Sequence, residues 1–360
     1  MLALEYIFRW YEMLHGGEIY DKKIKYDFSV NTNPFPCPED IKDMMIETVF
    51  AVDKYPDIAQ SQFRRAVAKA LNSSSYRCVF SPDMIIGGNG ASELIAAVTL
   101  MLQPRKVLLP VPSFWGYEHA LGMLESCEIN YYPLSKENDF ELTKGIVDAI
   151  EKDTDAVFLA NPNNPTGRCI SRDVLEKILE RCQDTGTKLI IDECFFSLSE
   201  GNTSARDYIR DYSELYVIDA YTKLFSIPGV RVGFLLSQSQ NIQNIKRYLP
   251  EWNMSSFALV AGVGCAKHCL KGYTDESMEY IRRERTFLEE NLKKCGIKVF
   301  KSDTNFLLLY SDENLYSYLL EKEILIRDCS NFRGLKKGYF RVAVKTHEEN
   351  KILIKCLREQ

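Results

Sequence analysis

The chain has 360 residues, of which 46% are hydrophobic and 26% charged, and its formal net charge at pH 7 is −5. This length suits a large domain with a smaller one, and a weakly acidic chain has no electrostatic signature of a nucleic-acid partner. The sequence contains no run of about 18 apolar residues, so no membrane span is expected. Its 11 cysteines are scattered without a CxxC pair, which predicts reduced thiols in a cytoplasmic protein.

The first ten residues are apolar, but Glu5 and Arg9 interrupt them. They lack the basic segment and the small-residue cleavage site of a signal peptide, so we expect an amphipathic helix there.

Strand-like and helix-like stretches alternate through the middle of the chain, which predicts an α/β domain with a mostly parallel sheet. The expected strands are Lys106–Pro110, Asp155–Ala160, Lys188–Asp192, Leu215–Ala220 and Val232–Ser237. The expected helices are Gly90–Leu102, Ser113–Glu125 and Ser171–Asp184. Ser171 is of a residue type that commonly caps a helix N-terminus.

After about Gln240 the pattern changes to longer helices and shorter strands. We expect a helix at Asp275–Lys294, strands at Asn305–Tyr310 and Tyr339–Val344, and a final helix. This part predicts a smaller second domain, and a cleft between two domains is a common place for a ligand.

A glycine-rich stretch, residues 87–90, stands directly before the first expected helix. Glycines let the backbone approach a phosphate closely, and a helix N-terminus offers free N–H groups and a positive dipole end. Two alternatives stay open at this point. One is a dinucleotide-binding turn, which is disfavoured because the third glycine is missing. The other is a plain helix cap.

Four more stretches carry candidate chemistry. Phe114 lies in an aromatic string that could stack on a planar ligand or pack in the core. Asn164 lies in the string Asn-Pro-Asn-Asn-Pro-Thr-Gly, which is more specific than an ordinary turn requires. Asp192 ends an apolar strand, where a carboxylate needs a partner or caps a helix. Lys223 could form a Schiff base with an aldehyde, and the fork of Arg231 suits a phosphate dianion.

Taken in this order, the asparagine loop, the aspartate, the lysine and the arginine resemble the active site of pyridoxal-phosphate (PLP) enzymes of the aspartate-aminotransferase fold. The resemblance covers nearly the whole chain. It implies the α/β fold of that family, with a large domain at residues 51–240 whose mostly parallel sheet lies between helices. An interdomain helix and a smaller α+β domain occupy residues 241–360, and residues 1–50 pack with the smaller domain.

The resemblance also implies how the cofactor is held. Lys223 carries the covalent link and later moves protons as a general acid and base, while Asp192 pairs with the protonated pyridine nitrogen. The family usually has a tyrosine where this chain has Phe195, so one hydroxyl on the cofactor oxygen is absent. The other implied cofactor-binding residues are Gly90, Ala91, Ser92, Phe114, Asn164, Thr222 and Arg231, with Tyr55 reaching across from the other subunit of a homodimer.

Further strings resemble the branch of the family that holds histidinol-phosphate aminotransferase and threonine-phosphate decarboxylase. Residues 15–17, 27–34 and 324–335 resemble the decarboxylase, and both enzymes share the string Tyr339–Val344. This implies that Arg341 binds the carboxylate of a small amino-acid substrate. Decarboxylase and transaminase differ in which bond of the substrate's α-carbon is held perpendicular to the ring, so both reactions stay open.

A phosphorylated substrate would bring a second anion to the cleft. Arg327 is available for it in the smaller domain, and His15 and Asn31 could add hydrogen-bond donors. In the alternative interpretation, His15 packs before a glycine turn and Arg327 pairs with a surface acid.

Three other classes of protein are disfavoured. A metal protein would need a second cysteine/histidine pair to complete a site, so we predict a buried helix face at Cys265, His268 and Cys269. A transcription regulator with an aminotransferase-like domain would need room for a DNA-binding domain. A nicotinamide dehydrogenase would need a glycine fingerprint near a first strand.

Overall fold

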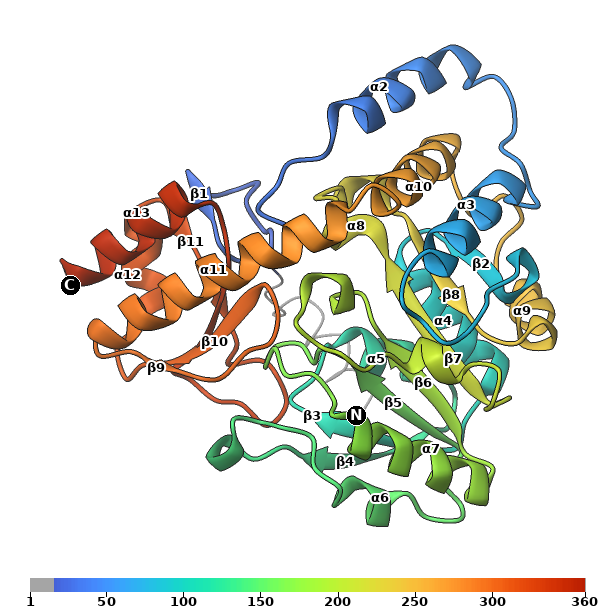
Figure 1. The fold of residues 1–360 in the computed structure, drawn as a ribbon. Coiled ribbons are helices and arrows are strands. Elements are labelled where there is room, and N and C mark those ends of the chain that lie inside the picture. The colour runs from blue at the N-terminus through green and yellow to red at the C-terminus, as the bar shows by residue number, and fades with distance from the viewer. Residues whose placement is uncertain (1–15, 360) are drawn as a thin grey trace.

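The computed structural model describes residues 16–359, which form a large and a small domain (Figure 1). The large domain is built on a seven-stranded sheet with the strand order β2-β8-β7-β6-β5-β3-β4. Strand β8 runs antiparallel to β2 and β7, and the other neighbours are parallel. The strands are β2 (Ile85–Gly88), β3 (Lys106–Val111), β4 (Glu128–Pro133), β5 (Ala156–Ala160), β6 (Lys188–Asp192), β7 (Leu215–Ala220) and β8 (Gly233–Leu236).

Helices cover both faces of this sheet, because its central strands are apolar on both sides. Successive side chains of a strand point to opposite faces. In β5, Val157 and Leu159 therefore pack into one apolar cluster, and Ala156 and Phe158 pack into the other. The helices of this part are α3 (Ser61–Asn72), α4 (Ala91–Leu102), α5 (Gly116–Leu121), α6 (Ile146–Ala149), α7 (Arg172–Thr185), α8 (Tyr221–Leu224), α9 (Ser239–Ile245) and α10 (Ser256–Cys269).

The small domain has a four-stranded antiparallel sheet with the order β12-β13-β10-β9. The long helix α11 (Tyr273–Lys294) runs from the large domain to this sheet (Figure 1). Phe28 lies in the apolar cluster of the small domain, and β1 (Tyr26–Asp27) pairs in parallel with β11 (Ile324–Leu325). The other elements are β9 (Lys298–Val299), β10 (Phe306–Tyr310), α12 (Leu315–Glu321), β12 (Arg327–Asp328), β13 (Tyr339–Ala343) and α13 (His347–Arg358).

A further helix near the N-terminus, α2 (Glu39–Thr48), lies along α10 (Figure 1). His268 of α10 contacts Asp40 of α2, with 2.7 Å between Nε2 and Oδ1, and Cys265 is fully buried beside it. Within residues 16–359, no group of three or more histidine, cysteine or acidic side chains is placed to hold a metal ion. None of the described helices is long and apolar enough to cross a bilayer.

The expected strands of the large domain are confirmed within one or two residues, but the expected helix Ser113–Glu125 is wrong in length. Helix α5 covers only Gly116–Leu121, and Gly122 caps its C-terminus before the chain turns into β4. Ser171 does precede α7, although its side chain makes no capping hydrogen bond. Strands β2 and β4 were not expected. Two glycines end β2, and polar, exposed residues interrupt the apolar pattern of β4.

Candidate active site

A cavity of about 240 Å³ lies between the two domains, at the carboxyl ends of the parallel strands. Ligands of open α/β sheets commonly bind at this edge. The large domain contributes predicted site residues from several strand ends and loops, and the small domain contributes two arginines. The predicted residues that line the cavity are Asn31, Ala91, Ser92, Phe114, Asn164, Asp192, Thr222, Lys223, Arg231, Arg327 and Arg341.

Lys223 lies on the short helix α8, directly after β7, and its side chain points into this cavity. Its Nζ is 5.8 Å from the centroid of the Phe195 ring. Burial lowers the pKa of Lys223 to about 8, and the nearby positive charge of Arg341 acts in the same direction. A larger fraction of the amine is therefore neutral near physiological pH than for an exposed lysine, and only the neutral amine is a nucleophile.

Asp192 ends β6, and two hydrogen bonds orient its carboxylate. Oδ2 accepts a hydrogen bond from the Tyr117 hydroxyl at 2.9 Å, and Oδ1 accepts one from the backbone N–H of Cys194 at 3.0 Å. Burial raises the pKa of Tyr117 well above its usual value, so this phenol stays a neutral donor. Sequence reasoning did not assign Tyr117 a role, although it named the aromatic string that contains it.

The start of α4 forms a narrow cradle with Arg231. Gly90 has φ +78, and a Cβ atom at this position would lie 2.3 Å from Nη2 of Arg231. Only glycine both adopts this backbone conformation easily and leaves room for the guanidinium. Ala91 and Ser92 form the first turn of α4 and line the cavity, as does Thr222. Free N–H groups of a helix N-terminus, with an arginine beside them, form a typical phosphate site.

Arg341 enters the cavity from β13 and joins three parts of the site. Its Nη1 donates a hydrogen bond to Oδ1 of Asn164, and its Nη2 donates one to the Ser29 carbonyl at 2.9 Å. Burial lowers the pKa of Arg341 to about 10. Its Nε, and both side-chain amide atoms of Asn31, are buried without a hydrogen-bond partner among residues 16–359. Because Asn31 and Arg341 line the cavity, a ligand there is placed to supply the missing hydrogen-bond partners.

Arg327 is the second arginine from the small domain. Its Nη2 donates a hydrogen bond to Oδ1 of Asn331 at 2.8 Å, and its guanidinium lies 5.2 Å from the Phe332 ring centroid. Burial lowers the pKa of Arg327. Neither Arg327 nor Arg341 forms an ion pair within the described part of the chain. The alternative pairing of Arg327 with a surface acid is thus not seen among residues 16–359.

Gly90, which forms the cradle with Arg231, and Tyr55 are predicted site residues that do not line this cavity. Tyr55 is 79% exposed and lies against Trp252, with 4.6 Å between the ring centroids. His15 lies outside the described residues. The cavity also contains a pair that sequence reasoning missed, Arg333 and Glu118, whose Nη2 and Oε2 are 2.8 Å apart. Because this pair joins segments 215 positions apart, no local pattern in the sequence indicated it.

Comparisons with known proteins agree with this geometry. A family model described as aminotransferase class I and II matches residues 23–357. The chain is 30% identical to the threonine-phosphate decarboxylase of Salmonella typhimurium, over 96% of this chain and 95% of that protein. The structure of the histidinol-phosphate aminotransferase from Clostridium acetobutylicum is also similar, with a TM-score of 0.83, 29% identity, and coverage of 93% of this chain and 98% of that one. A mutant aspartate aminotransferase of Thermus thermophilus shares the fold, with a TM-score of 0.80, 17% identity, and coverage of 92% and 90%. The expected aspartate-aminotransferase fold is thus confirmed.

Proposed function

Because the chain belongs to the class I and II aminotransferase family, we propose that it binds PLP and acts on a small phosphorylated amino acid or amine. The main reaction in this proposal is the decarboxylation of an O-phosphorylated hydroxy amino acid. The alternative is transamination of a substrate such as histidinol phosphate. Similarity to the decarboxylase of Salmonella typhimurium supports the first reaction, and similarity to the aminotransferase structure supports the second.

The residues of the cavity fit PLP. The cradle of Gly90 and Arg231 would hold the phosphate, Lys223 would hold the cofactor covalently, and Asp192 would keep a proton on the pyridine nitrogen. Bound PLP supplies an electron sink for the bonds of the substrate's α-carbon. The Lys223 amine would then move a proton at that carbon, while the Tyr117 hydroxyl keeps the Asp192 carboxylate oriented.

The observation that carries the choice of substrate is a pair of buried arginines that form no ion pair among residues 16–359. A buried cation without a partner is costly, so Arg327 and Arg341 are suited to two anionic groups of a ligand. Arg341 would bind the carboxylate beside Asn164. Arg327 would bind the phosphate, and the side-chain amide of Asn31, which has no hydrogen-bond partner among residues 16–359, would add a donor.

Products from two substrates test the reaction. With O-phosphothreonine, the proposal predicts release of carbon dioxide and formation of the phosphorylated amino alcohol. With histidinol phosphate and 2-oxoglutarate, the alternative predicts formation of glutamate. If the purified protein with PLP converts neither substrate, the proposed substrate class is wrong.

Substitution of Arg327 tests the phosphate site. Charge-assisted hydrogen bonds to a buried anion contribute roughly 1.5–3 kcal/mol each. Arg327→Ala should therefore lower kcat/KM for the phosphorylated substrate by about 10- to 150-fold, while the affinity for PLP hardly changes. Steady-state kinetics with O-phosphothreonine and threonine provide the measurement, because the variant should lose most of the preference for the phosphorylated compound. Equal rates with and without the phosphate in the unchanged protein would contradict the assignment.

We also propose that the protein is a homodimer that shares its active sites, with Tyr55 reaching the partner's cofactor phosphate. Support comes from an exposed apolar surface at the end of α2 and the segment after it. This surface comprises Ile46, Val49, Phe50, Val52, Tyr55 and Ile58, with Trp252 beside them. Contiguous exposed apolar residues mark interaction sites, and two-fold dimers are the commonest assemblies.

Two valines of equal exposure allow a matched test of this dimer. Val52 is 60% exposed within the apolar surface, and Val79 is 61% exposed outside it. Val52→Glu should place two charges in the subunit interface and shift the protein to monomers, whereas Val79→Glu should leave the dimer intact. Sedimentation equilibrium measures both. A monomeric unchanged protein with full activity would contradict the shared site.

A cytoplasmic location belongs to the same proposal. All 11 cysteines are free, and several of them are buried, which is typical of proteins from a reducing compartment.

A further inference from the structure

The loop that carries Asn164 is attached to the small domain directly before β10. The backbone N–H of Asp303 donates a hydrogen bond to the carbonyl of Gly167 at 2.8 Å, and Oδ2 of Asp303 accepts one from the backbone N–H of Cys169 at 2.9 Å. Gly167 has φ +76, and a Cβ atom there would lie 2.3 Å from Oγ of Ser302. The two turns are therefore closer together than a residue with a side chain at position 167 would allow.

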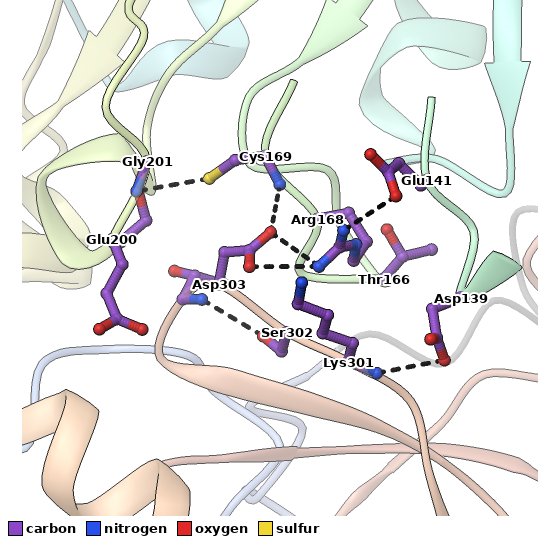
Figure 2. Close-up of polar contacts among 12 residues, drawn as sticks. Asp139, Glu141, Thr166, Arg168, Cys169, Glu200, Gly201, Lys301, Ser302 and Asp303 are labelled. Atoms are coloured by element: carbon purple, nitrogen blue, oxygen red, sulfur yellow. Dashed lines mark hydrogen bonds and ion pairs between the residues drawn. The ribbon is translucent and has the colours of Figure 1, made fainter. Parts of the chain in front are cut away.

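Arg168 reinforces this attachment with its charge. Its side chain, which is only 8% exposed, lies between the carboxylates of Asp303 and Glu141 (Figure 2). Nη1 is 3.1 Å from Oδ2 of Asp303, and Nη2 is 3.2 Å from Oε2 of Glu141. The contact with Asp303 crosses from the large to the small domain, whereas the contact with Glu141 stays within the large domain. Because Arg168 is buried, removal of Asp303 would leave this charge with only the more exposed carboxylate of Glu141 as a partner.

The attachment is connected to the active site at both of its ends. On the large domain, Arg168 follows Asn164 in the same loop. On the small domain, Asp303 precedes β10, which pairs with β13 so that Leu308 lies opposite Arg341. Across the cavity, Nη1 of Arg341 donates a hydrogen bond to Oδ1 of Asn164. A shift between the loop and β10 would therefore change how Arg341 faces Asn164.

We propose that Asp303 and Arg168 are positioning residues that hold Arg341 of the small domain in register with Asn164 of the large domain. Both side chains lie outside the cavity, so they act through the loop and through β10. The importance of this register for substrate rests on the proposed function, in which Arg341 binds the substrate carboxylate. The attachment itself is a property of the chain without cofactor or substrate.

Alanine substitutions on the two sides of Arg168 provide a matched test. Asp303→Ala removes the contacts of the Asp303 side chain with Arg168 and with the Cys169 N–H, which cross between the domains. Glu141→Ala removes the contact of Arg168 within the large domain. In the holoenzyme, Asp303→Ala should raise KM for the phosphorylated amino acid about tenfold, with a smaller change in kcat and an unchanged absorption spectrum and affinity for PLP. Glu141→Ala should leave KM within about twofold of the unchanged protein, because exposed ion pairs contribute little.

Two Arg168 variants separate positioning from general stability. Arg168→Met should raise KM as Asp303→Ala does, and the double variant should lose no more than either single variant, because the two residues act as one unit. Arg168→Lys, which keeps a charge beside Asp303, should restore most of the substrate affinity. If Asp303→Ala lowers Tm but leaves KM unchanged, or if Glu141→Ala raises KM equally, the positioning role is wrong.

Hydrogen exchange of the full chain without PLP gives a readout that does not depend on activity. Asp303→Ala should speed the exchange of the Cys169 amide and of the first residues of β10, and Glu141→Ala should not. Equal exchange in all variants would overturn the attachment. If the unchanged protein fails to bind PLP while the exchange follows this pattern, the proposed function is wrong and the attachment stands.

Discussion

Lys223→Ala is expected to abolish the covalent link to PLP and to lower turnover by more than about 10⁴-fold, since the same amine would hold the cofactor and move the proton at the substrate's α-carbon. The purified unchanged protein should be yellow and should lose its visible band on treatment with borohydride. Peptide mapping after borohydride reduction locates the modified lysine. Modification of another lysine would show that the assignment of Lys223 is wrong.

The pH dependence of cofactor attachment gives an independent check on Lys223. Its pKa in the fold is lowered to about 8 from the usual 10.5, mainly by burial. The neutral, nucleophilic form therefore increases as the pH rises through about 8 and then reaches a plateau. The rate at which protein freed of cofactor captures PLP should follow this curve. A rate that keeps rising to about pH 10.5 would indicate an ordinary, solvated lysine.

The second large effect is expected for Asp192→Asn, which should lower kcat by about 10²-fold or more because a neutral amide no longer keeps the pyridine nitrogen protonated. PLP should still bind, since the phosphate cradle and Lys223 are untouched. Steady-state kinetics and cofactor titration measure the two effects separately. Near-normal turnover would show that the carboxylate of Asp192 has a structural role.

Tyr117→Phe is the matched control for this substitution. It removes the hydroxyl that donates to Oδ2 of Asp192 at 2.9 Å, but it leaves the negative charge in place. The loss of one hydrogen bond that orients a carboxylate is expected to lower kcat only about tenfold. An equal loss for Tyr117→Phe and Asp192→Asn would mean that orientation, and not charge, is the main contribution of this carboxylate.

In this proposal, the Arg168–Asp303 contact affects substrate specificity more than the rate of the chemical step. Decarboxylation and transamination differ in how the substrate is held against the cofactor, and Arg341 and Asn164 would determine that pose. A contact that fixes the register of these two side chains is therefore a place where the choice of reaction could change. Asp303→Ala should be assayed with both O-phosphothreonine and histidinol phosphate for this reason.

The sequence by itself determined the alternation of strands and helices in the large domain and the candidate residues of the cavity. Each of these signals is local. A strand shows as a short apolar run, and residues such as Asp192, Lys223 and Arg231 stand in contiguous strings at the ends of strands. Local signals failed where apolar periodicity continued past a turn, as it does after Gly122, and where a strand is polar and exposed, as in β4.

Only the tertiary structure decided which side chains are partners. Tyr117 and Asp192 are 75 positions apart, Arg168 and Asp303 are 135 apart, and Asn164 and Arg341 are 177 apart. The absence of an acidic partner for Arg327 within residues 16–359 is also a property of the folded chain. Such contacts depend on how strands and domains pack, and no periodicity along a single segment encodes them.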